Sequence, residues 1–473
     1  MFRALRTLTT LAALTAVLSG CASFSADGGF GPVQQAAHQH LGKQLIWQRN
    51  DSDRMAIDSQ VAALLAQPLT ADSAVQLALL NNRGLQARFV DLGIGEAELV
   101  QASRLPNPGF SFGRLRKGDE REIERGLHIN LARLLAWPLV QPLQQRQLDR
   151  TRGAVAAEVL ALAADTRRAW VQAVAAIEVA RYRQQVMEAA EASAELARRM
   201  AQAGNFNRLQ QAREQGFYAE AALNHARAQG QREATREQLT RLLGLWGAQA
   251  TGSTAYRLPE RLPDLPEQTA ERPDIERHAI AQRLDVQGAQ LATEATARNL
   301  GLTRTTRFIN VLELGLVRNS SNEAATQTGW EVSFELPLFD WGSARVARAE
   351  SLYMQSLHAA AHTAINARSE VRQAYGAYRL AWDIARHHRQ ELVPLAQAVS
   401  EENLLRYNGM LIGVFELLAD ARTQIGTVNA AIEALRDYWL SQADLDAALV
   451  GKPMLLPMTS SADAAAPAGA AAH

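Results

Sequence analysis

The sequence predicts a mainly α-helical protein with a small β part and an internal two-fold repeat. Hydrophobic residues make up 47% of the chain but aromatic residues only 6%, and the apolar content is mostly Ala and Leu, which is typical of long, closely packed helices. Between the helical segments, the apolar period twice changes from 3.6 residues to 2. The pattern GxFxxLxxARxQ occurs at 204–215 and again at 413–424.

Residues 1–20 predict a lipoprotein signal peptide. The basic start MFRALR precedes the apolar run LTTLAALTAVL, which is too short to span a bilayer. The run ends in LSGC, which resembles a bacterial lipobox, so Cys21 is predicted to carry a lipid; the alternative is a plain signal peptide with an incidental cysteine. Cys21 is the only cysteine, which leaves the mature chain without a disulfide or a catalytic thiol.

Residues 21–68 are predicted to form a lipid-anchored extended segment, in which residues 59–66 could form a short helix. The first repeat, 69–258, begins with a helix capped by Thr70, whose side chain can accept a hydrogen bond from the first helical turn. This helix is predicted to run without a break until the prolines that follow Arg104.

Two strands follow, at about 108–115 and 125–132, because apolar and polar residues alternate there around a charged loop. Helix resumes after the prolines at 138 and 142, and the proline-free stretch from about Leu143 to Ala203 predicts a rod of roughly 90 Å. Gly204 and Asn205 form the turn to a second helix. Helices of this length predict a coiled coil.

A proline-rich linker at 259–272 precedes the second repeat, 273–452, and a tail at 453–473 is predicted to be disordered. The second repeat has the same order of elements as the first. Its segments are a helix to about Arg304, strands at about 308–317 and 329–338, and long helices from Ser343 to about Leu449 interrupted near Asn408.

The last strand has one wholly apolar face, formed by Trp330, Val332, Phe334 and Leu336. In a soluble sheet such a face packs on a core, whereas in a membrane barrel it meets lipid. The strands predicted in one chain are too few to close a barrel, and open sheet edges are not tolerated in lipid. If the sheet enters a membrane, the chain must therefore oligomerise, and three copies would form a 12-stranded barrel.

Four stretches carry a resemblance to the TolC family of outer-membrane efflux proteins, in its lipidated branch: LTADSAVQLALLNNRGLQAR at 69–88, AIAQRLDVQGAQLATEATARNL at 279–300, FELPLFDWGSARVARAE at 334–350 and YNGMLIGVFELLADARTQ at 407–424. The resemblance implies a homotrimer in the outer membrane of a Gram-negative bacterium. Its long α-helical hairpins would form a tunnel across the periplasm, continuing a shared 12-stranded β-barrel in outer-membrane lipid. It also implies two partners, a periplasmic adaptor and an inner-membrane pump.

Both copies of the repeated pattern fall at predicted hairpin turns, which the family places at the periplasmic end of the tunnel, where adaptors bind. We expect exposed or half-exposed residues there; the alternative is that they only pack the turn. The candidates for adaptor docking are Gly204, Asn205, Phe206, Gly409, Met410, Leu411, Ile412 and Gly413.

Glu416 and Asp420 are four residues apart and therefore share a helix face. In the family, acidic residues just after this turn ring the tunnel entrance, so we expect these two to form a gate that favours cations or neutral substrates over anions. The alternative is a solvated charged face. The first copy has Asn207 and Gln211 at the same positions, so only the second copy resembles a gate.

Several function classes find no support in the sequence. The formal net charge is zero, so nothing favours nucleic acid. No nucleophile elbow, phosphate loop or zinc motif occurs, so we expect no enzyme activity and no cofactor. His38 with His40, and His387 with His388, lack the spacing of known ligand sets, and we expect no metal site there.

Two hypotheses remain. The first is a passive exit duct for substrates delivered by the pump and adaptor, such as drugs or heavy-metal ions including copper. The second is a lipid-anchored periplasmic coiled-coil scaffold or adaptor that does not conduct. The apolar strand face favours the duct, because a scaffold does not need a lipid-facing row of aromatic residues.

Overall fold

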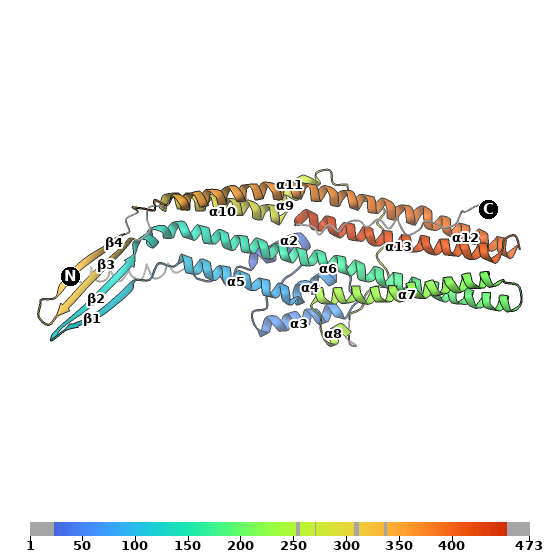
Figure 1. Ribbon diagram of the computed structural model, residues 1–473, viewed down its shortest axis with the longest axis horizontal. Coiled ribbons are helices and arrows are strands. Elements are labelled where there is room, and N and C mark those ends of the chain that lie inside the picture. The colour runs from blue at the N-terminus through green and yellow to red at the C-terminus, as the bar shows by residue number, and fades with distance from the viewer. Residues whose placement is uncertain (1–22, 252–255, 270, 307–311, 335–337, 452–473) are drawn as a thin grey trace. The chain divides into compact units, whose positions relative to one another are not determined.

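The computed structural model describes residues 23–251, 256–269, 271–306, 312–334 and 338–451 (Figure 1). The predicted signal peptide, Cys21 and the predicted tail at 453–473 lie outside these residues. Two compact units can be distinguished. Unit 1 comprises the described residues of Met1–Thr166, Leu239–Leu258 and Ile280–Ala367, and unit 2 those of Arg167–Gln238, Pro259–Ala279 and Arg368–His473.

Unit 1 begins with four helices: α2 (Gly31–Leu41), α3 (Asp51–Leu65), α4 (Ala71–Asn81) and α5 (Arg83–Ser103). The prediction of an extended segment at 21–68 is therefore wrong in part, because α2 and α3 lie within it, although α3 overlaps the short helix expected near 59–66. Val33 and Ala37 of α2 are buried in a core that α4, α5 and α6 (Leu131–Gln202) share. This burial of apolar side chains against long-range partners stabilises α2, which is short for a helix to be stable by itself.

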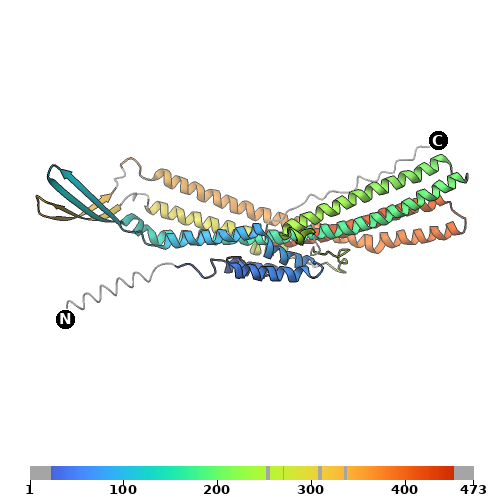
Figure 2. The same cartoon turned by 90° about the horizontal axis from the view of Figure 1, so that it is seen from below.

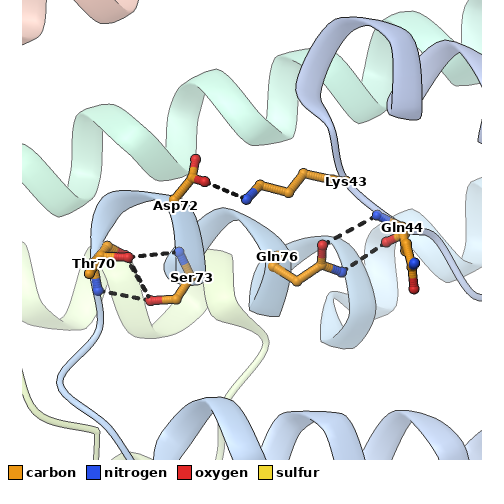
Figure 3. Close-up of polar contacts among 6 residues, drawn as sticks. All are labelled: Lys43, Gln44, Thr70, Asp72, Ser73 and Gln76. Atoms are coloured by element: carbon orange, nitrogen blue, oxygen red, sulfur yellow. Dashed lines mark hydrogen bonds and ion pairs between the residues drawn. The ribbon is translucent and has the colours of Figure 1, made fainter.

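Polar contacts join the N-terminal segment to α4 (Figure 3). Lys43 Nζ lies 2.7 Å from Asp72 Oδ2. The Gln76 side-chain amide accepts from the Gln44 backbone N–H at 3.3 Å and donates to its carbonyl at 2.9 Å. The predicted cap at Thr70 is confirmed, since its hydroxyl accepts from Ser73 N–H in a capping box.

The single helix predicted after Thr70 is interrupted at Asn82, between α4 and α5. The Asn82 side chain caps α5 by accepting from Leu85 N–H at 3.1 Å. It also donates to the Leu242 carbonyl at 2.9 Å, at the C-terminal end of α7 (Arg208–Leu243). Asn82 thus satisfies backbone groups at two helix ends, which compensates for the break.

The four strands form one antiparallel sheet in the order β1 (Gly109–Lys117), β2 (Glu120–Asn130), β3 (Leu312–Ser321) and β4 (Gln327–Phe334). All four strands were predicted, although residues 308–311 and 335–337 of the last two predictions lie outside the described part. β2 pairs with β3, so the two predicted repeats meet in the sheet (Figure 1).

Helix α6 (Leu131–Gln202) begins directly after β2. The prediction that helix resumes only after two prolines is wrong, because Pro138 and Pro142 both lie inside α6. Each proline removes one backbone hydrogen bond, and the helix continues through the remaining ones. Unit 1 also contains α8 (Ala248–Thr251), α10 (Leu284–Thr306), the beginning of α11 (Ser343–His387), and the last residues of α7 and of α9 (Ile275–Gln282).

Unit 2 contains the later part of α6, most of α7 (Arg208–Leu243), α9 (Ile275–Gln282 in part), the end of α11, the π-helix η1 (His388–Leu392), α12 (Val393–Asn408) and α13 (Val414–Val450). The linker packs onto this unit, because the indole N–H of Trp382 donates to the Pro266 carbonyl and that of Trp439 to the Pro263 carbonyl. The helix predicted after Pro273 is interrupted at Arg283. No helix among the described residues is both long and apolar enough to cross a membrane.

Candidate functional site at the hairpin turns

The first hairpin turn joins α6 to α7 at residues 203–207. Gly204 has φ +81°, and the N–H of Asn205 donates to the Met200 carbonyl at 2.9 Å. The Gly204 N–H donates to the Ala201 carbonyl at 3.1 Å, which completes a Schellman cap. Glycine suits this position because a left-handed backbone brings no steric cost without a Cβ atom.

The second turn joins α12 to α13 at residues 409–413, and it has the same hydrogen-bond pattern. The Met410 N–H donates to the Tyr407 carbonyl at 3.0 Å and the Leu411 N–H to the Arg406 carbonyl at 2.8 Å. The left-handed residue is Met410, with φ 57°, although Gly409 is its neighbour. A left-handed backbone costs a residue other than glycine about 1–2 kcal/mol.

The two copies of the sequence pattern therefore occupy different positions relative to the left-handed residue of their turns. Gly413 corresponds to Gly204 in the pattern, yet it is the N-cap of α13 with φ −83°. The left-handed position of the second turn lies at Met410, three residues before Gly413. The sequence repeat predicts both turns, but their register depends on where α12 ends, which the repeated pattern does not contain.

Most of the predicted docking residues are accessible. Met410 is 93% exposed and Leu411 77%, Ile412 is half-buried, and the turn glycines and Asn205 are exposed. Phe206 is different, because only 9% of its surface is accessible. The prediction that Phe206 is exposed or half-exposed is therefore wrong, as expected for a large apolar ring that gains free energy by leaving water.

A buried ion pair links the two hairpins close to their turns. Glu214 of α7 has a side chain that is only 3% exposed, and its Oε1 accepts from Arg422 Nη2 of α13 at 2.9 Å. Its Oε2 accepts from the Ser193 hydroxyl of α6 at 2.9 Å. The Arg422 guanidinium also lies 4.3 Å from the centre of the Phe217 ring, within cation–π range.

Sequence reasoning did not single out this link. Arg422 belongs to the repeated pattern, and its counterpart Arg213 in the first copy is exposed, with no ion pair to another described residue. The repetition of Ala-Arg was the signal that could have drawn attention to Arg422. Its partner Glu214 has no such signal, since the second copy has Thr423 at that position.

The two gate candidates differ in their surroundings. Glu416 is exposed in the first turn of α13, where a carboxylate is favourable next to the positive end of the helix dipole. Asp420 is half-buried, and its Oδ2 atom is buried without a hydrogen-bond partner in the described residues. An unpaired buried carboxylate oxygen is unfavourable, so this atom is suited to gain a partner from outside the described chain.

The histidine candidates do not come together with other ligand types. His387 Nδ1 lies 3.3 Å from a carboxylate oxygen of Glu391, and burial together with the neighbouring His387 lowers the pKa of His388. His38 and His40 lie on α2. In the described part of the chain, no group of three or more His, Cys, Asp or Glu side chains could hold a metal ion.

The comparisons with known proteins give matches at the level of structure. No protein-family model and no curated protein matches the sequence. A solved structure of CusC, from work on folding and transmembrane channel formation, has 18% identity and a TM-score of 0.65, covering 83% of this chain and 92% of that one. The Campylobacter jejuni CmeC outer membrane channel has 17% identity and a TM-score of 0.66, covering 85% and 88%.

The open state of the Neisseria gonorrhoeae MtrE outer membrane channel has 18% identity and a TM-score of 0.66, covering 83% of this chain and 89% of that one. Each of the three likenesses covers at least 83% of this chain. The chain therefore has the fold of the TolC-like outer-membrane channels.

Proposed function

We propose that three copies of this chain form the outer-membrane exit duct of a tripartite efflux system. The observation that carries the proposal is the combination of a channel fold with a sheet whose apolar face is exposed to solvent in the single chain. The duct itself would be passive, so an inner-membrane pump and a periplasmic adaptor would supply the energy and the substrate. Drugs and heavy-metal ions such as copper are the substrate classes we consider.

The register of the sheet supports insertion into lipid. One row across all four strands consists of Phe110, Leu127, Leu316 and Trp330, each directly opposite the next and each exposed. The next row toward the helices continues with Ile129, Leu314 and Val332. Large exposed apolar rows are unfavourable in water and favourable in a bilayer.

Closure of the sheet requires other copies. β1 and β4 each pair with one neighbour, so both outer edges of the four-stranded sheet have unpaired backbone groups. Unpaired backbone groups are too costly in a membrane, and only a closed barrel satisfies them. Three chains of four strands each would make the proposed 12-stranded barrel.

The exposure of apolar side chains on helix α12, in unit 2, also supports the proposed homotrimer. None of its residues is buried in the single chain, and Leu395, Val399 and Leu405 are exposed. Packing these side chains against a second copy would remove their apolar surface from water. In the trimer, α12 would thereby help to form the wall of the tunnel.

The turns would form the periplasmic end of the duct. The turn between α6 and α7 and the turn between α12 and α13 lie at the same end of unit 2 (Figure 2). Three copies of Glu416 and Asp420 would form rings of negative charge that disfavour anions. The exposed Met410 and Leu411 would offer apolar contacts to the adaptor. The left-handed backbone of Met410 is strained, and such strain is typical of residues at binding sites.

Conductance in a planar bilayer tests the proposal. The full chain, extracted from membranes, should migrate as a heat-modifiable oligomer and open ion-conducting pores. A monomer without β structure that does not conduct would favour the second candidate function, a lipid-anchored periplasmic scaffold.

A matched pair of variants tests the gate. Glu416→Gln with Asp420→Asn should reduce the preference for cations, whereas Asn207→Asp with Gln211→Glu, at the corresponding positions of the first copy, should change it less. Unchanged ion selectivity in the first variant would remove both acids from the gate.

A further inference from the structure

On the apolar face of the sheet, the rows nearest the hairpin loops contain arginines in addition to apolar residues. In the row after Phe110 and Leu127, Phe112 is opposite Arg125, and Arg125 is opposite Arg318. The next rows of the same face contain Arg114 opposite Ile123 and then Arg116 opposite Arg121. We define the basic rim as Arg114, Arg116, Arg121, Arg125 and Arg318, which are all exposed.

The opposite face of the sheet carries the opposite charge. Because side chains alternate between faces along a strand, the residues between the arginines point the other way. That face contains one lysine, Lys117, and five carboxylates on three strands: Glu120, Glu122, Glu124, Glu313 and Glu331. The sheet therefore separates positive from negative charge across its thickness.

The basic rim has no carboxylate partner within the described chain. Among the described residues, none of its five arginines forms an ion pair, and their side chains donate only to neutral oxygens: Arg116 to the Gly118 carbonyl at 3.0 Å and Arg125 to the Ser320 hydroxyl at 3.1 Å. By contrast, many arginines of the helices form ion pairs with carboxylates, such as Arg304 with Glu350 at 2.6 Å. The rim is thus a cluster of positive charge that lacks counter-charges.

Two pairs of arginines lie directly opposite each other across neighbouring strands, Arg125 with Arg318 and Arg116 with Arg121. Like charges at directly opposite positions destabilise a sheet. The acidic face has no such pair, since Glu120 is opposite Lys117 and Glu122 lies between Leu115 and Ser321. An anion held between opposed guanidinium groups would remove the repulsion, and phosphate oxygens match their paired N–H donors.

We propose that the basic rim binds phosphate groups on the headgroups of the membrane lipid surrounding the duct. This inference rests on the proposed insertion of the sheet, which places its apolar rows in the hydrocarbon and the rim beside the headgroups at the loop end. A headgroup phosphate is the occupant that fits, because the rim belongs to the same face as the lipid-contacting rows and adjoins them directly.

The experiment measures the lipid that the full chain retains. The protein is reconstituted in vesicles of a neutral, phosphate-free galactolipid that contain a diphosphorylated glycolipid, or the same glycolipid without phosphates. It is then extracted again in mild detergent, and the bound glycolipid is counted per protein. We expect the wild type to retain the phosphorylated form and to lose the dephosphorylated form.

Two single variants of β1 form a matched pair, because each removes one positive charge from the same strand. Arg114→Gln, on the rim, should reduce retention of the phosphorylated glycolipid about fivefold, the effect of one cation near an anionic lipid surface. Lys117→Gln, on the opposite face, should leave it unchanged. Combining Arg114→Gln with Arg125→Gln and Arg318→Gln should reduce retention more than tenfold, while the three corresponding lysine substitutions should preserve part of it.

The same vesicles separate this inference from the proposed function. If all variants conduct ions and the triple glutamine variant retains as much phosphorylated glycolipid as the wild type, the lipid site is refuted and the duct remains. Equal retention of both glycolipids by the wild type would also refute the site. If the wild type neither inserts nor conducts, the proposed function and the lipid site fail together. Should the triple variant not insert, the single Arg114→Gln variant decides the outcome.

Discussion

Removing the guanidinium of Arg422 tests how strongly the two hairpins of unit 2 are coupled. Arg422→Met keeps the aliphatic part of the side chain but leaves Glu214, whose side chain is 3% exposed, without its cation. Breaking a buried ion pair from one side costs about 3–5 kcal/mol. Arg422 is 37% exposed and Ser193 still donates to Glu214, so solvent screening and this hydrogen bond reduce the expected cost to about 2–3 kcal/mol.

The assay is a double-mutant cycle in denaturant, with Arg422→Met, Glu214→Gln and the combined variant of the detergent-solubilised full chain. The combined variant should be more stable than the sum of the single losses predicts, because no uncompensated charge then remains buried. Arg213→Met is the control, since Arg213 is the exposed counterpart in the first copy and should change the free energy of unfolding by less than about 0.5 kcal/mol. A coupling energy within about 0.5 kcal/mol of zero would refute the reasoning.

Three further predictions concern backbone strain and pH. Gly244→Ala should lower the free energy of unfolding by about 2–5 kcal/mol, because φ is +66° and a Cβ would lie 2.6 Å from the Asn81 carbonyl oxygen; a loss of less than about 1 kcal/mol in a denaturant titration would contradict this. Met410→Gly should raise it by about 1 kcal/mol by relieving the left-handed strain, whereas Gly413→Ala should lower it slightly, because alanine is a poorer N-cap residue than glycine; denaturant titration of both checks this. Burial raises the pKa of Glu178, so the folded state binds the proton of this carboxyl more tightly than the unfolded state does. The free energy of unfolding therefore increases as the pH falls through the raised pKa of Glu178. Glu178→Gln should therefore stabilise the protein near pH 7 relative to the wild type and lose this advantage in acid; parallel pH series of melting temperatures would show a constant difference if the idea is wrong.

The parts of the fold that depend on local chemistry could be predicted from the sequence. The alternation of apolar and polar residues indicated all four strands, Thr70 was identified as a helix cap, and both hairpin turns were located by glycine and asparagine. These features follow from hydrogen bonds and side-chain periods within a few residues of each other. The exposure of Met410 and Leu411 also followed from their position at a turn.

Other features depend on residues far apart in the chain, and only the tertiary structure decided them. The break at Asn82 is stabilised by the carbonyl of Leu242, and the buried charge of Glu214 is stabilised by Arg422. A buried polar group needs a partner in space, but nothing in the local sequence says where along the chain that partner lies. The charge separation in the sheet has the same origin: alternation places each arginine on one face, whereas only the pairing register brings Arg125 opposite Arg318.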